Sequence, residues 1–355
     1  MPKKTVTPRA RVEAALRKQY IDKIPFTIYE YKLPQCSVER DLRNRGLCIV
    51  NRHTPCFSVK TPNVRVTKSS VFDEKGHEQI TTYFETPYGT LNTVHEPAGF
   101  TSWTHAHMFK NKEDYKALEF YLNDQNILPA YDAFLTNQQM MGEDIILRGG
   151  LGSEPLQSII SGFMDTAIFA YEWMDNRDEI LKLYNILVEK RRQTYKIAAE
   201  SPALHFNYGG NVTPEIIGLD TFRKYYVPHY NEAAEVLHKK SKFIGVHFDA
   251  NCKLLKDDIA GTGLDYIEAF TPAPDTDMTM AEARKAWPCK VLWINYPSSV
   301  HLQPPEQIKQ TALDLIDAVK NPEGFIIGIT EDIPENLWQN SLCAIMDAIE
   351  ERAGC

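Results

Sequence analysis

The sequence lacks the features that mark membrane-spanning, secreted and nucleic-acid-binding proteins. No uninterrupted apolar segment reaches the roughly 18 residues that a bilayer span needs. The net charge is −8 and there is no basic stripe, so we expect no nucleic-acid partner and no membrane association. The segment from Met1 to Thr5 carries charge without an apolar run behind it. We therefore expect no secretory signal and a cytoplasmic protein.

The sequence also lacks the short motifs of several enzyme classes. Its seven cysteines include no C-x-x-C pair, and their odd number and wide spacing favour free thiols in a reducing cytosol over a disulfide framework. No Gly-x-Ser-x-Gly hydrolase element occurs. The loop from Gly149 to Gly152 lacks the Lys-Ser/Thr ending of a phosphate-binding loop.

Strand and helix patterns alternate over most of the 355 residues, a length that suits one α/β barrel. Short apolar runs predict a first strand ending near residue 29 and then strands at 144–148, 203–206, 243–247, 266–270, 291–295 and 324–329. Helical periodicity covers 113–122, 130–139, 155–173, 177–199, 221–239, 253–259, 305–319 and 335–352. Strands joined by such helices pair in parallel, so we predict a single (β/α)8 TIM barrel, with residues 1–355 as one domain.

Three local signals refine this prediction. Thr7 and Pro8 are typical of a helix start and predict an N-terminal helix before the first strand. Residues 56–105 alternate polar and apolar side chains between turn signals, which predicts a small antiparallel meander inserted beside the barrel. Pro228 predicts a kink within 221–239, and Thr279 with Glu282 forms a capping-box signature for one more helix.

The active site of such a barrel lies at the carboxyl ends of its strands. The residues at the predicted ends are Glu30 or Tyr31, Arg148 to Gly150, Asn207 to Asn211, His247 to Asp249, Glu268 to Thr271, Asn295 with Tyr296, and Thr330 to Asp332. Carboxylates and one histidine, with aromatic residues between them, are therefore expected to converge at one end of the barrel.

The His247-Phe248-Asp249 stretch closes the most apolar of these strands. Alternate residues of a strand share a face, so His247 and Asp249 should point the same way as half of a zinc site. Other roles stay open: His247 as a core histidine bonded to Asp249, Asp249 as a cap for the helix near Lys253, and Cys252 as a ligand in place of Asp249. His105-Ala106-His107 could also chelate a metal, although a surface loop favours an incidental pair.

The chain resembles the uroporphyrinogen decarboxylase superfamily over nearly its whole length, and three segments carry the resemblance. They are Thr7 to Val12 with Lys23 to Phe26, Tyr83 to Leu91, and His247 to Asn251 with Gly263 to Glu268. The superfamily holds a porphyrinogen decarboxylase and a set of zinc-dependent methyltransferases that exchange methyl groups with a corrinoid protein. The decarboxylase has an arginine-rich segment near R-Q-A-G-R that is missing around Tyr29 to Leu33, which favours the methyltransferase branch.

This resemblance implies a metal set of His247, Asp249 and Glu331. The thiol-methylating members carry His-x-Cys and a later Cys at the matching positions. Asp332, Cys252 or Glu268 could replace one of the proposed ligands. Two carboxylates and one imidazole form a harder set than thiolates, which should make zinc a stronger Lewis acid toward an ether oxygen.

The implied activity is the transfer of a methyl group from a methoxylated aromatic donor to the cobalt of a corrinoid protein, as in O-demethylation. Catalytic roles are expected for Glu331, Asp249 and Glu268, the last of which could equally be a supporting or solvated residue. The residues expected to bind substrate are Tyr208, Asn211, Phe270, Asn295, Tyr296 and Trp338, with the aromatic ones enclosing the ring. The expected cofactors are Zn²⁺ and a cobalamin on the partner, because this chain has no D-x-H-x-x-G motif.

Two alternatives remain at this stage. One is a metal-free decarboxylase acting on a less charged substrate, and the other is a barrel that binds a tetrapyrrole or corrinoid without chemistry. Methylamines and methanol are further possible donors, and the oligomeric state stays open, a homodimer included.

Overall fold

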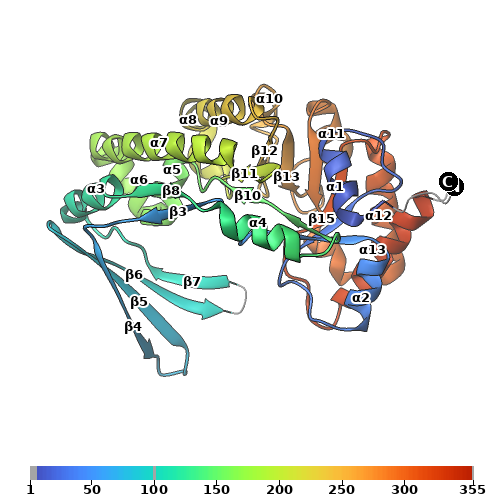
Figure 1. Ribbon diagram of the computed structural model, residues 1–355, viewed down its shortest axis with the longest axis horizontal. Helices are drawn as coiled ribbons and strands as arrows, with labels where there is room; N and C mark the ends of the chain where they lie inside the picture. The colour runs from blue at the N-terminus through green and yellow to red at the C-terminus, as the bar shows by residue number, and fades with distance from the viewer. Residues whose placement is uncertain (1–5, 99–100, 354–355) are drawn as a thin grey trace. The chain divides into compact units, whose positions relative to one another are not determined.

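The computed structural model describes residues 6–98 and 101–353, and the largest sheet among them is parallel with the strand order β10-β11-β12-β13-β14-β15-β1-β2-β9 (Figure 1). Only Arg148 separates β9 (Ile145–Leu147) from β10 (Gly149–Gly150), and these two segments stand at opposite ends of the strand order. They are halves of one strand that closes the sheet into an eight-stranded barrel. The predicted TIM barrel is confirmed.

The chain divides into two units. The first holds the barrel and consists of residues 6–56, 131–152 and 199–353 within the described ranges. The second consists of residues 57–130, without 99–100, and 153–198. That the whole chain is one domain stays a prediction.

The remaining barrel strands are β1 (Phe26–Tyr29), β2 (Leu47–Asn51), β11 (His205–Tyr208), β12 (Phe243–His247), β13 (Tyr266–Phe270), β14 (Val291–Asn295) and β15 (Phe325–Ile329). Every residue of β13, β14 and β15 is buried. Strands covered on both faces are expected to be apolar throughout, which explains why short apolar runs predicted them.

The helices of the barrel unit are α1 (Pro8–Leu16), α2 (Ser37–Asn44), α4 (Tyr131–Met140), α8 (Pro214–Tyr225), α9 (Val227–His238), α10 (Lys256–Ala260), α11 (Met280–Ala286), α12 (Pro305–Val319) and α13 (Trp338–Ala353), with the 3-10 turn η3 (Ser298–Leu302). Thr7 caps α1, and both hydrogen bonds of the Thr279–Glu282 capping box are present, so these two signals are confirmed.

Two predicted helices differ from the structure. The helix expected over 221–239 is two helices that meet at Tyr226, because Pro228 begins a second helix instead of kinking one. The helix expected over 155–173 is broken into α5 (Pro155–Gln157), the π-helical η2 (Ser158–Phe163) and α6 (Thr166–Asp175), with Asp165 capping the last.

The second unit contains the predicted antiparallel meander. Its four strands are β4 (Arg65–Phe72), β5 (Glu78–Thr86), β6 (Gly89–Ala98) and β7 (Thr101–Ala106), paired in chain order (Figure 1). A separate ladder joins β3 (Phe57–Lys60) to β8 (Asn126–Pro129). The unit's other elements are η1 (Lys112–Asp114), α3 (Tyr115–Asn123), α5, η2, α6 and α7 (Arg177–Glu200). Among the described residues of both units, no helix is long and apolar enough to cross a membrane.

Candidate active site in the barrel

The side chain of Glu268 is the centre of a polar cluster inside the barrel, and it is completely buried. Its Oε1 accepts a hydrogen bond from the Tyr29 hydroxyl and lies 3.0 Å from Nη1 of Arg148. Its Oε2 accepts from Nδ2 of Asn207 at 2.7 Å and lies 2.7 Å from Nδ1 of His247. Both oxygens of this carboxylate are therefore fully engaged, as a buried charge requires.

Strand register and alternation bring this cluster together. His247 on β12 and Glu268 on β13 are direct partners in the parallel ladder. Asn207 contributes from β11, the strand on the other side of β12, while Tyr29 comes from β1 and reaches Glu268 across the barrel interior. Tyr29 and His247 are the last residues of their strands, Asn207 is the last but one, and Glu268 lies mid-strand beside His247. The cluster therefore extends from the carboxyl ends of the strands, the active-site end of a TIM barrel, into the interior.

A backbone irregularity follows Glu268 directly. Ala269 has a φ of 59°, and the register between β13 and β14 shifts between Glu268 and Phe270. A left-handed conformation of a non-glycine residue costs on the order of 1 kcal/mol or more, and it persists where the surroundings enforce it. Such bulges re-aim side chains beside active sites.

Tyr266, two residues before Glu268 on β13, orients the side chain of Asn207. Its hydroxyl donates to the Asn207 side-chain oxygen at 2.7 Å, which fixes the amide so that its nitrogen faces Glu268. The Tyr266 ring fits because residue 245 is glycine: a Cβ at Gly245 would lie 2.2 Å from that ring. A side chain at this position would displace the tyrosine and, through it, the amide.

The cluster contains charged groups of both signs, and each changes the pKa of its neighbours. Burial by itself raises the pKa of the Glu268 carboxyl, but Arg148 and His247 outweigh it and hold that pKa well below the ordinary value. Burial by itself lowers the pKa of His247, but Glu268 and Asp249 outweigh it and raise that pKa. Burial and Glu268 raise the pKa of Tyr29, so its hydroxyl stays protonated and donates.

His247 and Asp249 come together as predicted. Nε2 of His247 lies 3.4 Å from Oδ2 of Asp249, and both side chains are partly exposed, at 17% and 30%. A Cβ at Gly210, whose φ is +150°, would lie 3.2 Å from the His247 Cβ, so the absence of a side chain there leaves room for the imidazole. Nδ1 is held by the buried carboxylate, and Nε2 is the nitrogen that faces outward.

A second carboxylate closes the cluster at the ends of β1 and β2. Glu30 is buried, its Oε1 accepts from the Arg52 backbone N–H at 2.9 Å, and it lies 3.1 Å from Nε2 of His53. The Arg52 guanidinium stands 3.6 Å from the centre of the Tyr29 ring. This cation–π contact fixes the ring whose hydroxyl faces Glu268.

The residues predicted to bind substrate divide between the two faces of the barrel strands, and the bulge at Ala269 turns Phe270 away from the face that Glu268 occupies. Asn295 is buried among the strand ends, where its Oδ1 accepts from the Thr330 N–H at 2.9 Å. The rings of Tyr208, Phe270 and Tyr296 are completely buried and pack outside the barrel, against Tyr230 of α9, Trp287 beside α11 and the Ile308 carbonyl of α12. These three rings fill the core in this structure, and their role in substrate binding stays a prediction.

The other predicted positions lie in loops or at the start of a helix. Asn211 is exposed in the loop after β11 with a φ of 56°, and Trp338 is buried at the start of α13. Glu331 is exposed after β15, while Asp332 pairs with Nζ of Lys32 at 2.6 Å. Their proposed roles stay predictions.

The structure bears on two alternative roles in the loop after His247, those of Cys252 and Asp249. Cys252 is buried, its thiol lies 3.3 Å from the Ala250 carbonyl, and burial raises the pKa of that thiol. The N–H groups of Cys252 and Lys253 are bonded by Asp277, at 3.0 Å and 3.2 Å to its Oδ1. Asp249 is therefore not the cap of this segment.

Comparison with known proteins adds the family. The profile of the uroporphyrinogen decarboxylase family (URO-D) matches residues 94–352, which is most of the chain. The chain belongs to the uroporphyrinogen decarboxylase family. The resemblance inferred from the three sequence segments is thereby confirmed.

Solved structures show how far the fold is shared. A methyltransferase from Methanosarcina mazei is similar with a TM-score of 0.59 and 12% identity, over 98% of this chain and 99% of that chain. A sugar phosphate isomerase/epimerase from Parabacteroides distasonis reaches a TM-score of 0.37 at 11% identity, over 91% and 94% of the two chains. A search of curated proteins found no match. At these identities the structural likeness shows the fold alone.

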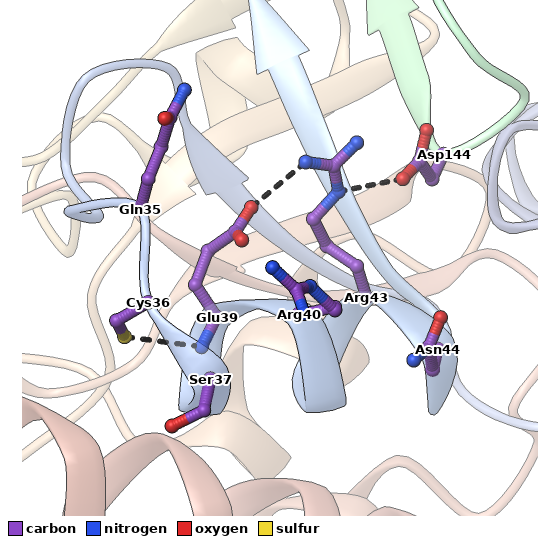
Figure 2. A pocket seen from close by; sticks show the side chains of 8 residues that line it. All are labelled: Gln35, Cys36, Ser37, Glu39, Arg40, Arg43, Asn44 and Asp144. Carbon is purple, nitrogen blue, oxygen red and sulfur yellow. Dashed lines mark hydrogen bonds and ion pairs between the residues drawn. The ribbon is translucent and has the colours of Figure 1, made fainter.

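A hollow of about 660 Å³ lies on the outside of this URO-D barrel, beside α2 (Figure 2). Figure 2 shows Arg43 between two carboxylates, 2.8 Å from Glu39 and 2.6 Å from Asp144. Both carboxylates therefore have this arginine as an ion-pair partner. None of the residues that line the hollow belongs to the Glu268 cluster.

The site residues assigned from the sequence did not include four members of the cluster: Tyr29, Arg52, Arg148 and Asn207. Arg148 and Asn207 were among the expected strand ends, but nothing in the sequence distinguished them from their neighbours. Arg52 was missed because strand β2 was not predicted, although the apolar run after Gly46 was a usable signal.

His205 predicts how the stability of this barrel changes with acid. It is completely buried at the start of β11, neither ring nitrogen has a hydrogen-bond partner among the described residues, and burial lowers its pKa to about 3. An unfolded histidine titrates near pH 6.5. The unfolded chain therefore binds a proton that His205 does not bind in the folded chain. The free energy of unfolding falls as the pH drops from about 6.5 toward about 3.

We expect this single group to cost about 2–3 kcal/mol of unfolding free energy at pH 4.5. Urea titrations of wild type and His205→Leu at pH 7.5 and pH 4.5 measure the effect. The variant should lose less stability on acidification by about that amount. An equal loss in both proteins would show that His205 is protonated within the fold.

Proposed function

We propose that this chain is a methyltransferase that moves a methyl group from a methoxylated aromatic donor to the cobalt of a corrinoid carried by a partner protein. Membership of the URO-D family supports an activity of this class. The observation that carries the proposal is His247, held through Nδ1 by the buried Glu268 while Nε2 faces Asp249 at the carboxyl end of β12.

This arrangement fits a metal-binding histidine. A ligating imidazole typically bonds a carboxylate through its other nitrogen, which fixes the ring and makes the ligating nitrogen more basic. His247 and Asp249 would hold zinc through Nε2 and Oδ2. Glu331 is proposed as a further ligand, although in this structure the ligand atoms of the three residues do not all lie within 4.8 Å of one another. When bound, zinc would supply a Lewis acid for the donor's ether oxygen.

The chain's own residues prepare the site. Glu268 fixes the orientation of His247, and Arg148 keeps the buried carboxylate ionised. The Tyr29 hydroxyl donates to the same carboxylate and lies 3.2 Å from Nδ1 of His247, so it stabilises both groups in one geometry. These contacts prearrange His247 and Glu268 before substrate or metal binds.

The test is a methyl-transfer assay with the full chain. Zinc-loaded protein, cob(I)alamin and a panel of methoxylated aromatics are mixed, and loss of the cob(I)alamin absorbance is followed. We expect transfer with at least one methoxylated aromatic. Transfer from methylamines or methanol alone would show that the donor belongs to one of those classes and is not a methoxylated aromatic. Decarboxylation of a porphyrinogen without methyl transfer, or cobalamin binding without either, would overturn the proposal.

A further inference from the structure

Outside the barrel, the turn between β4 and β5 presents one aspartate and one histidine together. Oδ1 of Asp73 accepts from the backbone N–H groups of Lys75 and His77, at 2.8 Å and 2.9 Å. Oδ2 is left facing the His77 ring, 3.7 Å from Nδ1.

Glu96 on the adjoining strand β6 joins this pair to a second histidine. Its Oε1 lies 3.1 Å from Nδ1 of His77, and its Oε2 lies 2.7 Å from Nε2 of His105 on β7. Glu96 is the least exposed of the four side chains, at 16%. His105 belongs to strand β7 and not to the loop expected from the sequence, and it is the residue without a ladder partner at the irregularity between β6 and β7.

We propose that Asp73, His77 and Glu96 form a binding site for a divalent transition-metal ion such as Zn²⁺, with His105 as a fourth or supporting ligand. One ligand atom from each of the three residues lies within 4.8 Å of the other two, and this is the one such group among the described residues. Mixed imidazole and carboxylate donors suit zinc and its neighbours, whereas Mg²⁺ and Ca²⁺ prefer oxygen alone.

The proposed ion would connect the three parts of the meander from which its ligands come. Asp73 and His77 lie in one turn, Glu96 lies on β6 and His105 lies on β7. Bound metal would therefore stabilise this sheet and need not take part in the chemistry at Glu268. This inference does not depend on the proposed function.

The test is a zinc titration of the full chain in the His247→Ala background, which removes the proposed barrel site. After treatment with a chelator, zinc binding is followed by calorimetry. We expect about one zinc per chain, a dissociation constant raised at least about 100-fold by His77→Ala, and a smaller increase from His105→Ala. Glu96→Gln keeps the shape of the side chain and should weaken binding as His77→Ala does.

His95 provides the matched control. It lies next to Glu96 on the same strand, and its Nδ1 is 3.1 Å from the Thr104 hydroxyl and outside the proposed ligand set. His95→Ala should bind zinc as the background protein does, and Mg²⁺ should not compete. No zinc binding in the His247→Ala background, or zinc binding that is as tight in the His77→Ala and Glu96→Gln variants as in that background, would overturn this site.

Discussion

Glu268→Ala is expected to lower the free energy of unfolding by about 3–5 kcal/mol, because it leaves the buried Arg148 guanidinium without its carboxylate. His247 would lose its Nδ1 partner in the same variant. Urea unfolding at pH 7.5 measures the change. The control is Glu323→Ala, an exposed residue, which should change stability by less than about 0.5 kcal/mol.

Removing both charges separates the cost of an unpaired charge from the value of the pair. The double variant Arg148→Met with Glu268→Leu should be less destabilised than the sum of the two single variants, since no isolated charge remains in the core. A Glu268→Ala variant within about 1 kcal/mol of wild type would contradict the buried cluster described above.

His247→Ala is expected to reduce methyl transfer at least about 1,000-fold, which corresponds to about 4 kcal/mol of transition-state stabilisation. The variant removes both the proposed ligand atom and the group that Glu268 orients. Single-turnover assays with the donor identified for wild type measure the rate.

The matched control for this prediction is His238→Ala. His238 is an exposed histidine that pairs with Asp265 near the start of β13, at the opposite end of the strands from His247. Its loss should leave the transfer rate within about twofold of wild type. A His247→Ala variant that keeps more than about a tenth of the wild-type rate would show that this imidazole does not serve the reaction.

The barrel could be predicted from sequence because its strands are short apolar runs separated by helices. The barrel strand that was missed, β2, begins two residues after α2, a helix that was not predicted either. The break within 155–173 was missed because η2 keeps helical spacing of apolar residues. Boundaries of this kind are decided by local caps and packing more than by periodicity.

The site was predicted in part. Strand alternation predicted that His247 and Asp249 point the same way, and the two side chains lie 3.4 Å apart although β12 ends at His247. Alternation also means that Asn295 and Tyr296 cannot both face the interior, yet both were assigned to the substrate site. Contacts across the barrel, such as Tyr29 with Glu268, depend on the register of all eight strands and on side-chain length, which no local pattern encodes.

The central claim is a zinc ion held by His247 and Asp249 at the carboxyl end of β12, and zinc analysis tests it most directly. The His77→Ala variant, which lacks the proposed meander site, serves as the starting protein. We expect about one zinc per chain, and close to none after adding His247→Ala or Asp249→Ala. Zinc absent from the starting protein, or unchanged by both added substitutions, would contradict the claim and return the decarboxylase and binding-protein alternatives to consideration.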